Sequence, residues 1–227
     1  MNDGEVFEAA QRPHTRRTWL AHCSVLLFAA TAAYAVPARA ASPTILVVGD
    51  SLSAEYGLKR GSGWVSLLDA RLAQSKIAAT VVNASISGDT TSGGRSRLPA
   101  LLKQHQPGVV VLELGGNDAL RGLPLSMTRD NLAAMARAAK AAGAKVVIVG
   151  MQVPPNYGRQ YGDEFAGLFA TVAKSEGTAL VPFLLKGVAD GPQADTMFQP
   201  DRIHPKAEAH PAILDNVWPV LRPLLLR

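Results

Sequence analysis

Cysteine is nearly absent from this sequence, because its 227 residues include only one, Cys23. That residue falls within an N-terminal segment with the pattern of an export signal, so the mature chain is expected to contain no cysteine. Disulfide bonds, a thiolate nucleophile and cysteine-ligated metal ions are therefore excluded for the mature protein. Any nucleophile must come from another residue type.

Signatures of nucleotide and nucleic-acid binding are also missing. No Gly-x-x-x-x-Gly-Lys-Ser/Thr loop and no Gly-x-Gly-x-x-Gly fingerprint follows an apolar run. The formal net charge of +5 is dispersed along the chain rather than gathered into basic runs interleaved with aromatic residues. We therefore expect no nucleic-acid partner.

Residues 1–40 have the pattern of an export signal that is cleaved. Two arginines precede an apolar stretch at 19–35, and residues 38–40 (Ala-Arg-Ala) have the small-x-small pattern of a cleavage site. The stretch is too short and too rich in alanine for a membrane span, so no stable membrane insertion is expected after cleavage. We predict a periplasmic or secreted protein, with one catalytic domain at 41–227.

The mature sequence alternates short β-branched runs with longer segments of helical period. This pattern is typical of a parallel sheet covered by helices on both faces, and it predicts an α/β/α sandwich. Strands are expected at 44–48, 79–82, 109–114, 145–149 and 179–182. Helices are expected at 64–72, after a cap at Thr128, around 165–173, and from Pro205 onward, with a bend or break at Pro219.

Unusual polar residues follow several of these strands and open the final helical segment. Ligands of open parallel sheets sit outside the carboxyl ends of the strands, so these residues are expected to meet at one edge. A serine after a strand suits nucleophilic attack, and a histidine three residues after an aspartate can be oriented by it as a base. The segments are 49–53 (Gly-Asp-Ser-Leu-Ser), 85–91 around Gly88, 116–118 (Gly-Asn-Asp) and 201–205 (Asp-Arg-Ile-His-Pro).

Together and in this order, the four segments resemble the blocks of the SGNH hydrolases, also called the GDSL esterase and lipase family. Residues 50–57, 114–122 and 155–158 are most similar to the periplasmic thioesterase I, protease I and lysophospholipase L1 group, also described as arylesterases. The resemblance spans nearly the whole mature chain. It implies a flavodoxin-like sandwich that hydrolyses small acyl esters or thioesters, with no metal and no organic cofactor.

The resemblance also implies a role for each matching residue. Ser51 would attack the acyl carbon, His204 would take its proton, and Asp201 would orient the imidazole. The backbone N–H groups of Ser51 and Gly88 and the side-chain amide of Asn117 would form the oxyanion hole. We expect the protein to act as a monomer.

Several alternatives remain at this stage. His210 is a rival base, although no aspartate stands three residues before it. Asp50 and Asp118 are expected to brace loops rather than act as acid and base. The same residues could remove acetyl groups from carbohydrate, or the chain could be a non-catalytic binding module. Apolar residues in the loops 118–124 and 153–158 (Leu120, Leu123, Pro154 and Pro155) suggest an acyl groove.

Overall fold

The computed structural model describes residues 42–226. Within the compact unit from Ala41 to Arg227, five parallel strands form one sheet in the order β2-β1-β3-β4-β5. The strands are β1 (Thr44–Gly49), β2 (Thr80–Asn83), β3 (Val109–Glu113), β4 (Lys145–Val149) and β5 (Ala179–Val181). The predicted five-stranded α/β fold is confirmed. The predicted export signal, residues 1–40, lies outside the described residues.

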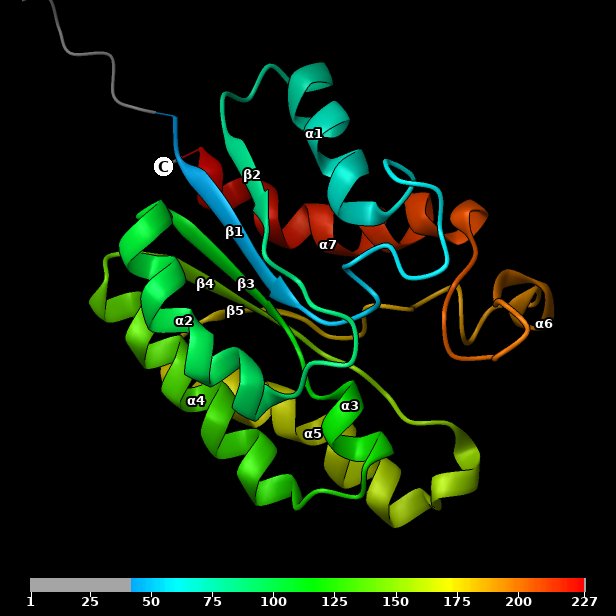
Figure 1. Cartoon of the computed structure of the whole chain (residues 1–227). Helices are drawn as coiled ribbons and strands as arrows, with labels where there is room; N and C mark the ends of the chain where they lie inside the picture. The colour runs from blue at the N-terminus through cyan, green and yellow to red at the C-terminus, as the bar shows by residue number, and fades with distance from the viewer. Residues whose placement is uncertain (1–41, 227) are drawn as a thin grey trace, which may run out of the picture. The chain divides into compact units, whose positions relative to one another are not determined.

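Helices cover both faces of the sheet (Figure 1). One face is covered by α2, α4 and α5, which pack against one another, and the other by α1 and α7. The longer helices are α1 (Trp64–Gln74), α2 (Thr91–His105), α4 (Leu125–Ala141), α5 (Arg159–Glu176) and α7 (His210–Leu225). Short helical turns are α3 (Gly116–Leu120), η1 (Pro155–Tyr157), α6 (Ala194–Met197) and η2 (Ala207–Ala209).

The core lies between these layers. Strand β3 is buried along its whole length, as is β1 after its first residue, which explains why both read as continuous apolar runs rather than alternating ones. The predicted apolar face of α4 is buried, and so is the apolar stripe of α5. Because all five strands are parallel, the residues that connect strands to helices emerge at a single edge of the sheet, where the strand arrows point in Figure 1.

Three helical predictions need correction. Thr128 is inside α4 rather than at its cap, because the helix begins at Leu125 and the buried Thr128 hydroxyl donates to Asp118. The final helix begins at His210, since Pro205 pairs with Phe198 in an isolated antiparallel bridge. Pro219 does not break this helix, which is continuous to Leu225.

Candidate active site

Ser51 occupies the turn that directly follows β1. The Asp50 carboxylate accepts the Leu52 N–H at 3.0 Å, and the Asp50 carbonyl accepts the Ala54 N–H at 3.0 Å, so the turn is held from both sides. Glycine is required just before it, because a Cβ at Gly49 would lie 2.8 Å from a Glu113 carboxyl oxygen. This close packing fixes the backbone that carries the serine.

The structure brings Ser51 together with His204 and Asp201, which are about 150 residues further along the chain. Ser51 Oγ lies 2.9 Å from His204 Nε2, and His204 Nδ1 lies 2.7 Å from Asp201 Oδ2. An ionised carboxylate only accepts hydrogen bonds, so Nδ1 donates to Asp201 and Nε2 is left to accept the Ser51 proton. The arrangement is that of a nucleophile, a base and an orienting acid.

The other oxygen of Asp201 is held by the backbone. Asp201 Oδ1 accepts from the N–H groups of Ile203 at 2.9 Å and His204 at 3.0 Å. Burial raises the pKa of Asp201, but these N–H groups and the adjacent imidazole outweigh it and lower the pKa to about 2. Asp201 is therefore ionised at neutral pH.

Two of the predicted oxyanion residues come from other segments than the serine turn: Gly88 lies on the loop after β2, and Asn117 lies in the short helix α3 after β3. The loop of Gly88 is tied to β1 by a bond from Ile86 N–H to the Gly49 carbonyl at 3.0 Å. Asn117 Nδ2 donates to Asp50 Oδ2 at 3.0 Å, which leaves the second amide N–H for another acceptor. Gly88 has a φ of +80°, a conformation that suits glycine.

Buried carboxyl groups support this edge of the sheet, as predicted for Asp50 and Asp118. Asp118 accepts from the N–H of Thr91 at 2.9 Å and from its hydroxyl, so it joins α3 to α2. Glu113, which sequence reasoning missed, is fully buried and accepts from Ser53 Oγ at 2.7 Å and Asp50 N–H at 3.3 Å. Burial and, after it, the neighbouring Asp50 carboxylate raise the pKa of Glu113 well above its ordinary value, which favours the neutral form of this side chain.

His210, the rival base, has a structural position. It is 2% exposed, and its Nδ1 accepts the Trp64 N–H at 3.0 Å. Trp64 is the first residue of α1, so His210 satisfies one of the N–H groups left free at a helix start. Burial lowers the pKa of His210, which keeps the ring neutral and able to accept this bond.

Tyr56 is the second residue at the site that sequence reasoning missed. Its ring centroid lies 4.3 Å from that of His204, with the two planes inclined by 36°. The loop that carries Tyr56 is closed by Glu55, whose carboxylate accepts the Gly61 and Gly63 N–H groups. The signal in the sequence was the place of Tyr56 in segment 50–57, five positions after the serine, which does not by itself indicate contact with a distant histidine.

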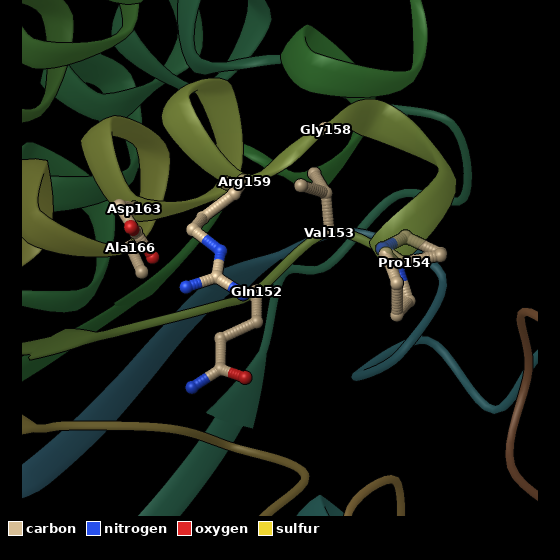
Figure 2. Close-up of a pocket in the computed structure, with 9 residues that line it drawn as sticks. Gln152, Val153, Pro154, Gly158, Arg159, Asp163 and Ala166 are labelled. Atoms are coloured by element: carbon tan, nitrogen blue, oxygen red, sulfur yellow. The ribbon is translucent and has the colours of Figure 1, made fainter.

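Two of the four residues that suggested an acyl groove, Pro154 and Pro155, border a cavity. A cavity of about 500 Å³ lies between the loop after β4 and the start of α5 (Figure 2). Pro154 and Pro155 line it, but Leu120 and Leu123 do not. The lining of the cavity is mixed rather than purely apolar, and no residue of the predicted catalytic or oxyanion set belongs to it. The lining residues are Gln152, Val153, Pro154, Pro155, Gly158, Arg159, Gly162, Asp163 and Ala166.

Within residues 42–226, no group of three or more His, Cys, Asp or Glu side chains is placed to hold a metal ion. The same stretch contains no helix that is long and apolar enough to span a membrane.

A sheet with a serine after its first strand, and an Asp-x-x-His pair returning from the far end of the chain, defines an acyl hydrolase of the α/β/α class. Residues 47–212 match the GDSL-like Lipase/Acylhydrolase family, and the chain belongs to that family. Both the predicted family and the predicted ester-hydrolase class are confirmed.

Characterised relatives resemble this chain over most of their length. Esterase TesA of Pseudomonas aeruginosa is 52% identical over 202 residues, covering 89% of this chain and 99% of that protein. Thioesterase 1/protease 1/lysophospholipase L1 of Escherichia coli is 44% identical over 186 residues, covering 82% and 86%. An arylesterase of Vibrio mimicus is 44% identical over 180 residues, covering 79% and 88%.

Solved structures agree with the fold described above. A crystal structure of TesA matches 80% of this chain and 99% of the crystallised chain, with a TM-score of 0.77 and 54% identity. The psychrotrophic esterase EstA from Pseudoalteromonas, inhibited by monoethylphosphonate, matches 82% of this chain and 100% of its own, with a TM-score of 0.75 and 37% identity.

Proposed function

We propose that this hydrolase cleaves carboxylic esters and acyl thioesters through a covalent acyl-Ser51 intermediate. The observation that carries the proposal is the continuous chain of contacts from Ser51 Oγ through the His204 ring to Asp201. His204 takes the proton as Ser51 Oγ bonds to the acyl carbon, and returns it to the leaving oxygen or sulfur as that bond breaks. Water then attacks the acyl group by the same route and restores the serine.

The negative charge that develops on the acyl oxygen needs donors. The N–H groups of Ser51 and Gly88 and the second amide N–H of Asn117 are assigned this role. The bond from Asn117 to Asp50 supports the assignment, because it orients an amide beside the serine turn before substrate binds. Donors that are already oriented need no rearrangement during the reaction.

The activities named for the relatives indicate the substrate range of this hydrolase. An esterase, an arylesterase and a thioesterase with lysophospholipase activity point to small aryl and acyl esters and to acyl thioesters. Removal of acetyl groups from carbohydrate is the second candidate, because the same triad would serve it. The mixed, partly charged lining of the cavity beside α5 favours neither long nor short acyl chains.

The test is hydrolysis of p-nitrophenyl esters from acetyl to palmitoyl by the purified protein and by Ser51→Ala, with fluorophosphonate labelling alongside. We expect turnover and labelling that both disappear in Ser51→Ala. A strict acetyl preference would favour the deacetylase. A folded protein that neither turns over these esters nor reacts with the probe would refute the mechanism and favour a binding module.

Location and assembly are part of the proposal. The export pattern in residues 1–40 supports a periplasmic or secreted protein, and nothing in the site requires a second subunit to complete the triad. Fractionation of cells that express the chain with and without residues 1–40 tests export. Light scattering of the purified protein tests the expected monomer.

A further inference from the structure

Exposed apolar side chains gather around the candidate active site. Among the described residues, five large apolar side chains are exposed, and four of them are on segments that carry site residues: three on loops and one, Leu120, at the end of α3. These four are Tyr56, Ile86, Leu120 and Ile203, which are 49%, 53%, 43% and 43% exposed. Exposed apolar side chains that gather at one place usually mark a binding surface, so we infer that these four side chains contact the substrate.

The four residues divide into two pairs according to their neighbours. Ile86 is on the loop of Gly88, and Leu120 ends α3, the short helix of Asn117. Arg121, directly after α3, joins the two segments by donating to the Gly88 carbonyl at 2.8 Å. Ile203 directly precedes His204, and the Tyr56 ring contacts the His204 ring. One pair is therefore next to the oxyanion donors and the other is next to the base.

Tyr56 is held in place relative to His204 by backbone contacts. Gln199 Nε2 donates to the Tyr56 carbonyl at 3.0 Å and to the Pro205 carbonyl at 3.2 Å. The Gln199 N–H donates to the His204 carbonyl at 2.8 Å, so Gln199 connects the loop of the tyrosine to the loop of the histidine. The backbone that carries the half-exposed Tyr56 ring is thus tied to the loop of His204, and the ring itself lies against the His204 ring.

The chemistry of ester cleavage indicates which part of the substrate meets the surface formed by Tyr56 and Ile203. His204 must deliver a proton to the leaving oxygen, so the leaving group departs past His204 Nε2. Whatever substituent the leaving oxygen carries then lies beside the His204 ring. The exposed apolar surfaces in contact with that ring, or adjacent to it in the chain, are those of Tyr56 and Ile203.

We propose that Tyr56 and Ile203 form a leaving-group platform that favours esters of aromatic alcohols. The Tyr56 ring packs against an aromatic leaving group during acylation, and Ile203 borders it. The inference rests on the proposed function, because it places the leaving group relative to Ser51 and His204. Aromatic pairs contribute beyond their buried area, so the Tyr56 ring is worth about two- to tenfold in kcat/KM for an aromatic leaving group.

The experiment compares three butyrate esters that differ only in the alcohol: benzyl, cyclohexylmethyl and methyl. kcat/KM is measured for the parent, Tyr56→Phe, Tyr56→Leu and Tyr56→Ala. We expect Tyr56→Ala and Tyr56→Leu to lose two- to tenfold on benzyl butyrate relative to methyl butyrate, with a smaller loss on cyclohexylmethyl butyrate. Tyr56→Phe should keep the parental ratio.

Control variants separate the platform from other roles. Leu226→Ala, which removes an exposed leucine after the end of α7, should leave all three rates unchanged. Ile86→Ala should leave the benzyl-to-methyl ratio unchanged. Equal losses on all three esters would mean that Tyr56 only orients His204, and equal losses on the two ring-bearing esters would mean that aromaticity is irrelevant. Either result overturns the platform.

Failure of the platform and failure of the proposed function give different results. Methyl butyrate turnover that requires Ser51, combined with a benzyl-to-methyl ratio that no Tyr56 variant changes, rejects the platform alone. Absence of Ser51-dependent turnover on every ester rejects the proposed function and the platform together.

Discussion

Glu113 offers a direct test of how the sheet edge beneath the serine is built. The side chain is fully buried, and only one of its oxygens accepts hydrogen bonds, from Ser53 and Asp50. Its other oxygen, Oε1, has no partner among the described residues. Burial first, and the nearby Asp50 carboxylate second, raise the pKa of Glu113 well above its ordinary value of 4.5.

A raised pKa in the folded state has a definite sign for stability. Above pH 4.5 the unfolded chain releases the Glu113 proton, whereas the folded protein keeps it. The folded protein therefore binds more protons, and the free energy of unfolding falls as pH rises, by about 1.4 kcal/mol per pH unit for one proton. The fall continues until the pH reaches the folded pKa and then stops.

Glu113→Gln should remove this contribution while keeping an acceptor for Ser53 and Asp50. We expect the variant to match the parent near pH 5 and to be more stable at pH 7, because glutamine has no proton to lose. Urea unfolding at pH 5, 6, 7 and 8 measures the difference, with the exposed Glu208→Gln as the matched control. Parallel stability profiles for parent and Glu113→Gln, or equal destabilisation at every pH, would refute the reasoning.

Three further substitutions test the site and its backbone. Asn117→Ala should lower kcat about 10²- to 10³-fold in steady-state ester hydrolysis with little change in KM, and an unaltered kcat would remove Asn117 from the oxyanion hole. Asp201→Asn should lower kcat about 10⁴-fold because His204 would hold the wrong tautomer, and urea unfolding checks that the fold remains. Gly88→Ala should cost about 1–2 kcal/mol in urea unfolding, because φ is +80° there while the added Cβ meets only Arg121 at 3.7 Å. The control Gly167→Ala, exposed inside α5 with open space around it, should instead gain about 0.5–1 kcal/mol.

The sequence was sufficient to predict the sheet and to propose the principal site residues. Apolar β-branched runs marked all five strands to within one residue at each end. The central strands β1, β3 and β4 are buried almost throughout, which is why they are continuously apolar. The segments containing Ser51 and His204 were recognisable because each residue type suits its role and each follows or precedes a regular element. Their contact was inferred from the rule that strand ends share an edge, and the structure places them 2.9 Å apart.

Helix boundaries were harder to predict, for local physical reasons. The helix α2 was not among the expected helices. It contains Gly93, Gly94 and Pro99, which are poor helix formers, yet tertiary packing retains it. A close approach explains Gly94, since a Cβ there would lie 2.3 Å from a Leu114 methyl carbon. Packing against the sheet therefore outweighs the local preference.

Only the tertiary structure decided which side chains support the chemistry. The sequence alone determined that a serine, a histidine and an aspartate of the right kinds are present and that a parallel sheet could bring them together. The contacts of Tyr56 with His204, Asn117 with Asp50 and Glu113 with Ser53 join residues that are 60 or more positions apart. No periodicity marks such pairs, because periodicity reports the faces of a single element, whereas these contacts depend on how separate loops converge at the sheet edge.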